Sequence, residues 1–119
     1  MKIIKRNNLQ FHVREGTLDE WVVDEVSGDA SYINPLEIKD TDIVLDIGAN
    51  IGVFTVTALQ RGAVVVAYEP DYDNFSIAKK NIKLNGLQDC ATIHNLGVSD
   101  VDKTTWLYLP DNLDKSHHR

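Results

Sequence analysis

Glycines and carboxylates with the spacing of a ligand site lie in the middle of the chain. In the segment IVLDIGANIG, residues 43–52, Asp46 precedes Gly48 and Gly52, and the acidic residue Glu69 follows Gly48 by 21 positions. Glycine lacks the Cβ that would keep a ligand away from the backbone, and a helix that begins after this turn directs free N–H groups toward the same point. We therefore expect a ligand with an anionic or polar group at the glycine turn.

A strand, a helix and a second strand must position these residues. Residues 43–47 have the apolar pattern of a strand buried on both faces, a helix is expected to begin near Ile51, and residues 63–68 are β-branched and apolar. In a right-handed β-α-β unit the carboxyl ends of adjacent parallel strands lie side by side, which would bring Glu69 next to the glycine turn. Its carboxylate could then accept from both hydroxyls of a ribose, so the ligand is predicted to be a nucleoside.

The glycine pattern decides between two classes of nucleoside cofactor. The dinucleotide fingerprint G-x-G-x-x-G has its second glycine where this chain has Asn50, which counts against a nicotinamide cofactor. The pattern D-x-G-x-x-x-G at residues 46–52, followed by Glu69 and Pro70, instead resembles the motifs of class I S-adenosylmethionine-dependent methyltransferases. More narrowly, DIGANIG, then YEP, then NIKLNG is similar to the FkbM-type methyltransferase family, over about residues 32 to 100.

The resemblance implies an α/β fold, a Rossmann-like doubly wound and mostly parallel sheet, with S-adenosyl-L-methionine as the cofactor. In such a site the glycine turn receives the methionine portion, Asp46 lies near its ammonium, and Glu69 binds the ribose. The Glu-Pro pair and the loop after the third strand flank the adenine, and Tyr32 approaches the methionine end. Asn50 could contact the cofactor or lock the loop to its own backbone. The implied cofactor-binding residues are Asp46, Gly48, Ala49, Asn50, Gly52, Glu69, Pro70, Asn95 and Leu96.

The same resemblance predicts O-methyl transfer to a hydroxyl of a sugar or a secondary metabolite, and hence a small-molecule acceptor. In the FkbM-type family a later segment with a D-x-E-G motif completes the sheet and lines the acceptor pocket; this chain lacks it, so the fold is expected to be truncated after the cofactor-binding half. We assign no catalytic residue, because nothing places a histidine at the methyl group, and no spacing indicates a metal site. Two alternatives stay open: a non-catalytic or partner-completed S-adenosylmethionine-binding fragment and, with less support, a nicotinamide-dependent oxidoreductase.

The chain, residues 1–119, is predicted to form a single partial methyltransferase domain. Its N-terminal extension contains a helix over residues 18–26, begun by a capping box between Thr17 and Glu20, with Trp21 packed on the sheet. The expected division is residues 1–40 for this extension, 41–100 for the cofactor-binding core and 101–119 for a strand and a tail.

The core is expected to continue with a helix over residues 72–84, begun by an aspartate cap, and a strand over residues 91–94. In a truncated sheet the strand over residues 43–47 would be an exposed apolar edge, which invites pairing with another chain. Self-association through this edge is therefore predicted, unless residues 106–109 or the N-terminal segment cover it.

The amino-acid composition limits which binding partners and which cellular compartment are expected. The 18 acidic and 12 basic residues give a formal net charge of −6, from which we expect no nucleic-acid partner. The lysines at positions 79, 80 and 83 are expected to be a solvated helix face. There is no apolar stretch long enough for a membrane span and no signal-peptide pattern, so no membrane partner is expected. The single cysteine, Cys90, is read as a small strand residue that fits a reducing compartment, and the cytoplasm is the predicted location.

Overall fold

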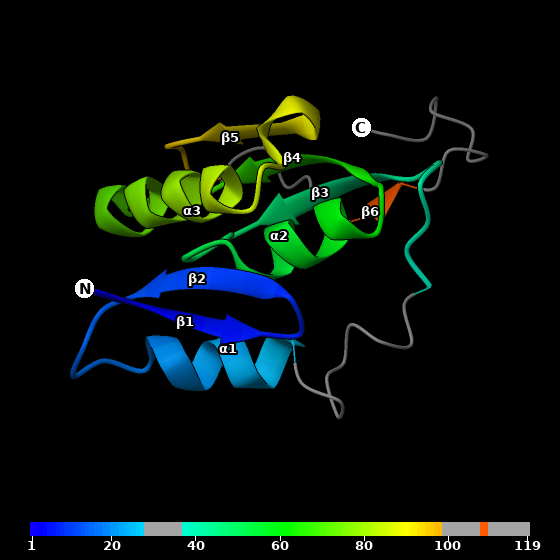
Figure 1. Cartoon of the computed structure of the whole chain (residues 1–119). Coiled ribbons are helices and arrows are strands. Elements are labelled where there is room, and N and C mark those ends of the chain that lie inside the picture. Colours follow the sequence, from blue (N-terminus) through cyan, green and yellow to red (C-terminus); the bar gives the residue numbers. More distant parts are fainter. Residues whose placement is uncertain (28–36, 99–107, 110–119) are drawn as a thin grey trace.

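The computed structural model of the protein describes residues 1–27, 37–98 and 108–109. An antiparallel hairpin of β1 (Lys2–Arg6) and β2 (Leu9–Val13) opens the chain (Figure 1). Its two-residue turn is Asn-Asn with φ values of +53° and +70°, a left-handed conformation that asparagine tolerates and that matches the twist of a hairpin. The weakly strand-like segment expected from the sequence is therefore two paired strands.

The larger sheet has the strand order β5-β4-β3-β6. Its strands β3 (Ile43–Ile47), β4 (Val64–Tyr68) and β5 (Ala91–His94) are parallel, and β6 (Tyr108–Leu109) pairs antiparallel with β3. This mostly parallel sheet, connected through helices, confirms the Rossmann-like α/β class predicted from the sequence.

Within the described residues, three α-helices and one short 3₁₀ helix accompany the strands. They are α1 (Asp19–Ser27), α2 (Val53–Gln60), α3 (Tyr72–Leu84) and η2 (Gln88–Cys90). In the described part of the chain, no helix has the length and apolar character that crossing a membrane requires. The division into an N-terminal extension, a core and a tail stays a prediction.

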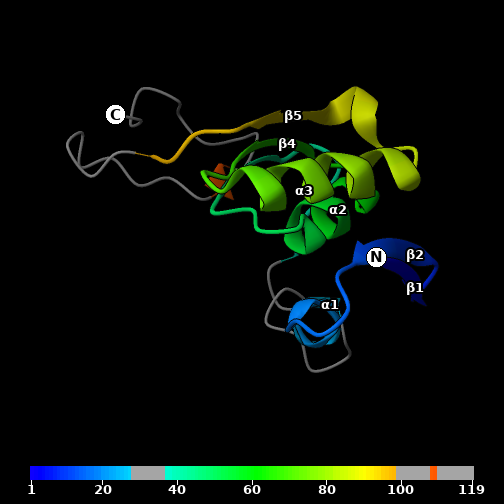
Figure 2. The same cartoon turned by 90° about the vertical axis from the view of Figure 1, so that its left-hand side faces the viewer.

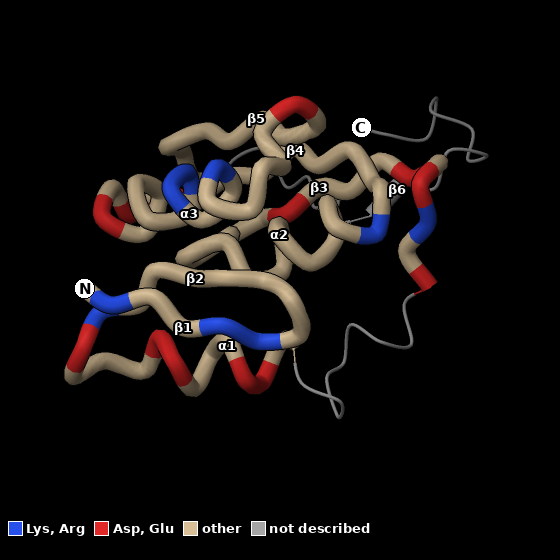
Figure 3. Tube along the Cα trace, viewed as in Figure 1, with Lys and Arg blue, Asp and Glu red and all other residues tan. Residues whose placement is uncertain are grey.

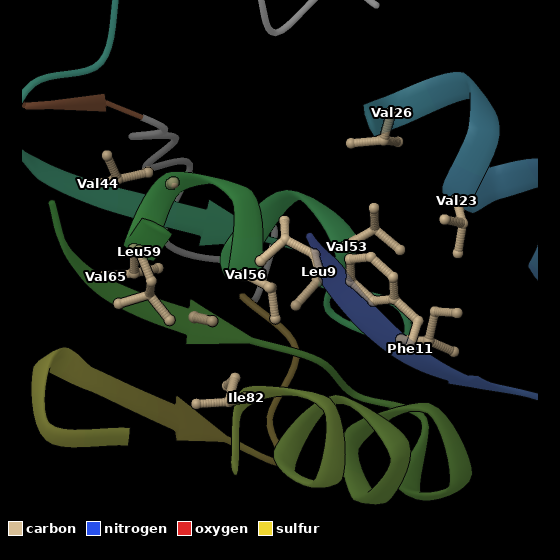
Figure 4. Packing of buried hydrophobic residues seen from close by; sticks show 14 of the residues in the cluster. Leu9, Phe11, Val23, Val26, Val44, Val53, Val56, Leu59, Val65 and Ile82 are labelled. Atoms are coloured by element: carbon tan, nitrogen blue, oxygen red, sulfur yellow. The ribbon is translucent and has the colours of Figure 1, made fainter. Parts of the chain in front are cut away.

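Helix α2 is buried on nearly all sides, which explains its almost uniformly apolar sequence VFTVTALQ. The larger sheet lies on one side of it, and the hairpin with α1 lies on the other (Figure 2). Phe11 of β2 and Val23 of α1 belong to the same buried cluster as Val53 and Val56 of α2 (Figure 4). The N-terminal segment thus shares one core with the strands that carry the glycine turn.

The two faces of β3 differ in burial, contrary to the expectation of a strand buried on both. Val44 faces the helices together with Val65 of β4, and both are fully buried. The alternate residues Ile43, Leu45 and Ile47 are only half-buried, because α2 and α3 cover the opposite face.

The edge of β3 is partly covered, so the predicted exposed edge is not fully present. Tyr108 pairs with Val44 and Leu109 with Ile43. Part of the run over residues 106–109 therefore occupies the edge through which self-association was expected.

Two expectations for α1 are wrong in detail. Glu20 does not complete a capping box, because its carboxylate pairs with Arg6 and Lys2 of β1 at 3.0 and 3.3 Å. Basic residues of β1 lie alongside acidic residues of α1 (Figure 3). The hydroxyl of Thr17 accepts instead from the N–H of Asp19 at 3.2 Å. Trp21 is 60% exposed rather than packed on the sheet, because the buried stripe of the helix passes through Val23 and its neighbours one turn away.

Helix α3 begins and ends as predicted. Asp71 is the N-cap and accepts from the N–H of Asn74 at 2.9 Å, while Gly86 follows the helix with φ +69°. The lysines at 79, 80 and 83 are exposed, as expected. Cys90 is exposed in η2 and not in a strand, because β5 begins one residue later.

Candidate functional site

The glycine turn between β3 and α2 has a backbone that few sequences can adopt. Gly48, Asn50 and Gly52 have φ values of +80°, +57° and +91°. These left-handed conformations strain side chains other than those of glycine and, to a lesser degree, asparagine. The turn therefore requires the residue types found at these three positions, whatever it binds.

The two glycines of the turn have different roles. A Cβ built on Gly48 would meet no atom within 4 Å, so this position faces open space. A Cβ on Gly52 would come within 3.1 Å of Cα and Cβ of Ala78, so Gly52 allows the start of α2 to pack against α3. Gly48 is thus the place where a ligand can approach the backbone, and Gly52 is a packing residue.

Most N–H groups of the turn already have protein partners, which corrects the expectation that they are free. Those of Gly48 and Ala49 both donate to the carbonyl of Tyr68, at 2.8 and 3.0 Å, and that of Gly52 donates to the carbonyl of Ala49 at 2.9 Å. Helix α2 begins at Val53, two residues later than predicted. The N–H groups of its first turn have no intrahelical acceptor and are the ones that remain for a ligand.

Glu69 lies beside the glycine turn, as the β-α-β argument predicted. Its Oε1 accepts from the N–H of Asn50 at 2.6 Å and its Oε2 from the N–H of Asp71 at 2.9 Å, and the residue is 6% exposed. The carboxylate therefore ties the turn after β3 to the loop after β4. Each oxygen of an ionised carboxylate has more than one acceptor position, so both can still accept from a ligand hydroxyl.

Asp46 is a second buried carboxylate at the same end of the sheet. It is 8% exposed and accepts a hydrogen bond from the hydroxyl of Thr55. Burial raises the pKa of Asp46 and the negative charge of Glu69 raises it further, while the Thr55 hydrogen bond opposes the rise. A positively charged group placed beside Asp46 would favour its ionised form.

The loop after β5 braces the loop after β4. The side-chain amide of Asn95 donates to the carbonyls of Glu69 and Pro70, both at 3.0 Å. Both N–H bonds of this amide are used in these contacts, so its oxygen is the atom that could accept a hydrogen bond from a ligand. Pro70 is exposed, and Leu96 is 58% exposed next to Asn95.

The structure brings together almost the whole predicted set, from Asp46 to Leu96, at the carboxyl ends of three parallel strands. Sequence reasoning missed Thr55 and Asn81, two buried polar residues that bond to Asp46 and to the carbonyl of Ile51. Each is a polar residue at a core position of an apolar helix face. This pattern could have indicated a buried side chain with a specific hydrogen-bond partner. The cofactor-binding role of the predicted set stays a prediction.

Other sequence candidates are less informative. Tyr32, His117 and His118 lie outside the described residues. His94 stacks on Tyr68 with ring centroids 5.0 Å apart. Among residues 1–27, 37–98 and 108–109, no three metal-binding side chains come together.

A comparison with protein families assigns the chain. The family model described as ribosomal protein L11 methyltransferase (PrmA) matches residues 30–106, more than half of the chain. The chain belongs to the PrmA family. The class I S-adenosylmethionine-dependent methyltransferase assignment made from the motifs is thereby confirmed, but the narrower FkbM-type resemblance is not. The glycine turn and the acidic residue after the next strand resemble motifs of the whole class I, so they indicate the class and not one family within it.

Individual relatives agree with the PrmA assignment. The ribosomal protein L11 methyltransferase of Bacillus pumilus is 33% identical over 64 residues, which cover 53% of this chain and 21% of that protein. A tRNA (guanine(37)-N(1))-methyltransferase of Anopheles gambiae is 33% identical over 66 residues, covering 56% of this chain and 12% of that protein. The chain therefore spans about a fifth or less of these relatives.

A solved structure shares the fold of the PrmA-family chain. It is an RNA methyltransferase from Salinibacter ruber in complex with S-adenosyl-L-homocysteine, with a TM-score of 0.54 and 26% identity, covering 69% of this chain and 52% of that one. The ligand of that structure agrees with the cofactor predicted from the sequence, because S-adenosyl-L-homocysteine is S-adenosyl-L-methionine without its transferable methyl group.

The exclusion of nucleic acid as a partner is wrong by the same comparison. Methyltransferases named for tRNA and RNA are among the proteins that this chain resembles. The exclusion rested on the formal net charge of −6, which is a sum over the chain and does not describe the local surface that meets a nucleic acid.

Proposed function

We propose that this protein binds S-adenosyl-L-methionine at the glycine turn and takes part in methyl transfer from it. The proposal rests on one observation: an open stretch of backbone and two buried carboxylates lie together at the carboxyl ends of β3 and β4. Backbone is open at Gly48, and the buried carboxylates of Asp46 and Glu69 lie close enough for the charge of one to raise the pKa of the other. An open backbone beside two buried anions suits a ligand with a cationic end and a pair of hydroxyls.

The described residues fit the parts of this cofactor. The open space at Gly48 accommodates the methionine portion, and its ammonium offsets the unfavourable burial of the Asp46 charge. Glu69 keeps acceptor positions for the two ribose hydroxyls, since its bonds to Asn50 and Asp71 use one position on each oxygen. Pro70 and Leu96 offer apolar surface to the adenine, and the Asn95 oxygen offers a polar edge. The bound cofactor would supply the electrophilic methyl group, and the residues named here would hold and orient it.

The acceptor that we propose is a macromolecule, an RNA or a ribosomal protein. The support is the PrmA family match together with the tRNA methyltransferase relative. The sugar or secondary-metabolite hydroxyl expected from the FkbM-type resemblance lacks this support. The cytoplasmic location, where the translation apparatus lies, stays a prediction.

A second candidate is a cofactor-binding fragment that does not catalyse alone. It is favoured by the coverage, since the chain matches only 21% of the Bacillus pumilus relative and 12% of the Anopheles gambiae relative. In that case cofactor binding is retained and methyl transfer requires a partner.

Calorimetry with S-adenosyl-L-homocysteine and with NAD, side by side, tests the cofactor. We expect saturable binding of the first and none of the second. Absence of S-adenosyl-L-homocysteine binding would overturn the proposal, and tight NAD binding would favour an oxidoreductase.

Transfer of a labelled methyl group to purified tRNA, ribosomal RNA and ribosomal protein L11 tests the acceptor. Label in one of these fractions supports the macromolecular acceptor. Cofactor binding without label in any fraction would support the fragment instead.

A further inference from the structure

Asn81 of α3 and Asn85, the C-cap of that helix, close the free edge of β2, opposite β1. Asn85 accepts from the N–H of Gln10 at 2.9 Å and donates to its carbonyl at 2.8 Å. Asn81 accepts from the N–H of His12 at 2.6 Å and donates to its carbonyl at 3.4 Å. Residues 10 and 12 direct their backbone groups to the same edge, and residues 81 and 85 lie one helical turn apart. The side-chain amides thus stand where a third strand would be.

Asn81 makes one contact that Asn85 does not. Its Nδ2 also donates to the carbonyl of Ile51, at 2.8 Å, inside the glycine turn. Asn81 is fully buried, so this bond is shielded from bulk water. The preceding residue, Asn50, has φ +57° and gives its N–H to Glu69.

The glycine turn is therefore held from two sides. The Glu69 carboxylate holds the N–H of Asn50, and the Asn81 amide holds the carbonyl of Ile51. Ala78, one turn before Asn81, lies so close to Gly52 that a Cβ there would meet it at 3.1 Å. One face of α3 thus sets the position of the second half of the turn, and the same amide is fixed by the backbone of β2.

We propose that Asn81 is a positioning residue of the cofactor site and that it makes the N-terminal hairpin part of that site. This inference rests on the proposed binding of S-adenosyl-L-methionine. The left-handed conformation at Asn50, which is less favourable for a residue with a side chain, persists because the surrounding structure holds it. Removal of the Asn81 amide releases the Ile51 carbonyl, and the turn then populates conformations that do not fit the ligand.

Asn81→Ala and Asn85→Ala form a matched pair. Both remove an amide from the edge of β2. Asn81→Ala also removes the contact to the carbonyl of Ile51 in the turn, whereas Asn85→Ala removes a bond to the backbone carbonyl of Asn81, which is not part of the turn. With S-adenosyl-L-homocysteine as the probe, calorimetry should show a dissociation constant raised roughly tenfold or more for Asn81→Ala, the equivalent of one lost buried hydrogen bond, and changed less than about twofold for Asn85→Ala. Equal effects of the two variants, or an unchanged constant in Asn81→Ala, would overturn the proposal.

A ligand-free measurement separates this inference from the proposed function. In amide NMR spectra without ligand, the resonances of Asn50, Ile51 and Gly52 should shift in Asn81→Ala and stay in place in Asn85→Ala. If these resonances shift but the wild-type protein fails to bind S-adenosyl-L-homocysteine, the positioning role holds and the proposed function fails. Unshifted resonances in Asn81→Ala overturn the positioning role. Should Asn81→Ala not fold, Asn81→Ser, which leaves a hydroxyl in the cavity, is compared in the same way.

Discussion

The hydroxyl of Thr55, in the first turn of α2, donates a hydrogen bond to the carboxylate of Asp46 in β3. Thr55 is fully buried and Asp46 is 8% exposed. The bond joins the helix start to the central strand at the end of the sheet where the glycine turn lies. It satisfies part of a buried charge that has no ion-pair partner among the described residues.

Thr55→Val should therefore destabilise the protein. The substitution keeps the β-branched shape and removes the only donor shown for the buried carboxylate, so we expect the free energy of unfolding to fall by about 1–3 kcal/mol. Thr57→Val is the control, because the hydroxyl of this buried residue bonds only to the carbonyl of Val53 within the same helix. Urea unfolding of both variants checks the prediction, and an equal loss in the two would refute it.

Asp46 makes stability depend on pH in an unusual direction. Burial raises its pKa above the ordinary value of 3.8, so the folded state binds the proton more tightly than the unfolded state does. The ionised carboxylate therefore costs stability above its folded pKa, and this cost disappears as the pH falls below 3.8. Asp46→Asn should raise the free energy of unfolding at pH 7, with a gain that shrinks as the pH falls toward 4. Urea midpoints of both proteins across this range measure the effect; a gain that does not depend on pH would count against the mechanism.

The same variant should lose cofactor affinity. The ammonium that we place beside Asp46 would face a neutral amide, so the dissociation constant for S-adenosyl-L-homocysteine should rise by roughly tenfold or more, the loss of one charge-assisted contact. Calorimetry at pH 7 provides the measurement. Greater stability together with unchanged affinity would remove Asp46 from the site.

Glu69→Ala should affect both binding and local structure. The carboxylate accepts from the N–H groups of Asn50 and Asp71, so its removal leaves two backbone donors without their partner. We expect the affinity for S-adenosyl-L-homocysteine to fall at least roughly tenfold and the free energy of unfolding to fall by about 1–3 kcal/mol. Hydrogen exchange at Asn50 and Asp71 should accelerate. Asp89→Ala, at an exposed position of η2, is the charge-matched control, and unchanged binding in Glu69→Ala would make the ribose assignment wrong.

The two glycines of the turn should respond differently to alanine. Both have positive φ, which costs a side chain about 1 kcal/mol or more. Gly52→Ala adds a clash with Ala78 at 3.1 Å, whereas the Cβ of Gly48→Ala enters open space. Thermal unfolding should show the larger loss for Gly52→Ala, and calorimetry should show weaker cofactor binding in the stable Gly48→Ala protein. The reverse order of stabilities would contradict the packing role of Gly52.

The sequence was sufficient for the elements and for most of the site. A β-branched apolar run located β4, and the aspartate cap and the Asn-Gly stop located α3, almost to the residue, because each is a clear local signal; β5 was also predicted with its observed bounds. The spacing from Gly48 to Glu69 predicted that they meet, since a β-α-β unit leaves little freedom at the ends of adjacent strands. The rest of the predicted set, including Asn95 and Leu96, came from the resemblance to class I methyltransferases, and its cofactor-binding role stays a prediction.

Other features depended on contacts between distant segments. Glu20 does not form a capping box, because two basic side chains of β1 lie beside it and pair with its carboxylate. Trp21 is exposed because packing against the hairpin determines which face of α1 is buried. The partner class was misjudged because a net charge carries no information about position on a surface.

By itself, the sequence determined a β-α-β unit with a glycine turn beside a strand-end carboxylate, since glycine conformations and the ends of adjacent parallel strands have a fixed geometry. Only the tertiary structure decided how the turn is held. One buried amide joins Asn81 to Ile51, 30 positions away in the sequence, and to His12, 69 positions away. No periodicity encodes such a contact, because a buried polar side chain is satisfied by whichever backbone groups the packed fold brings to it.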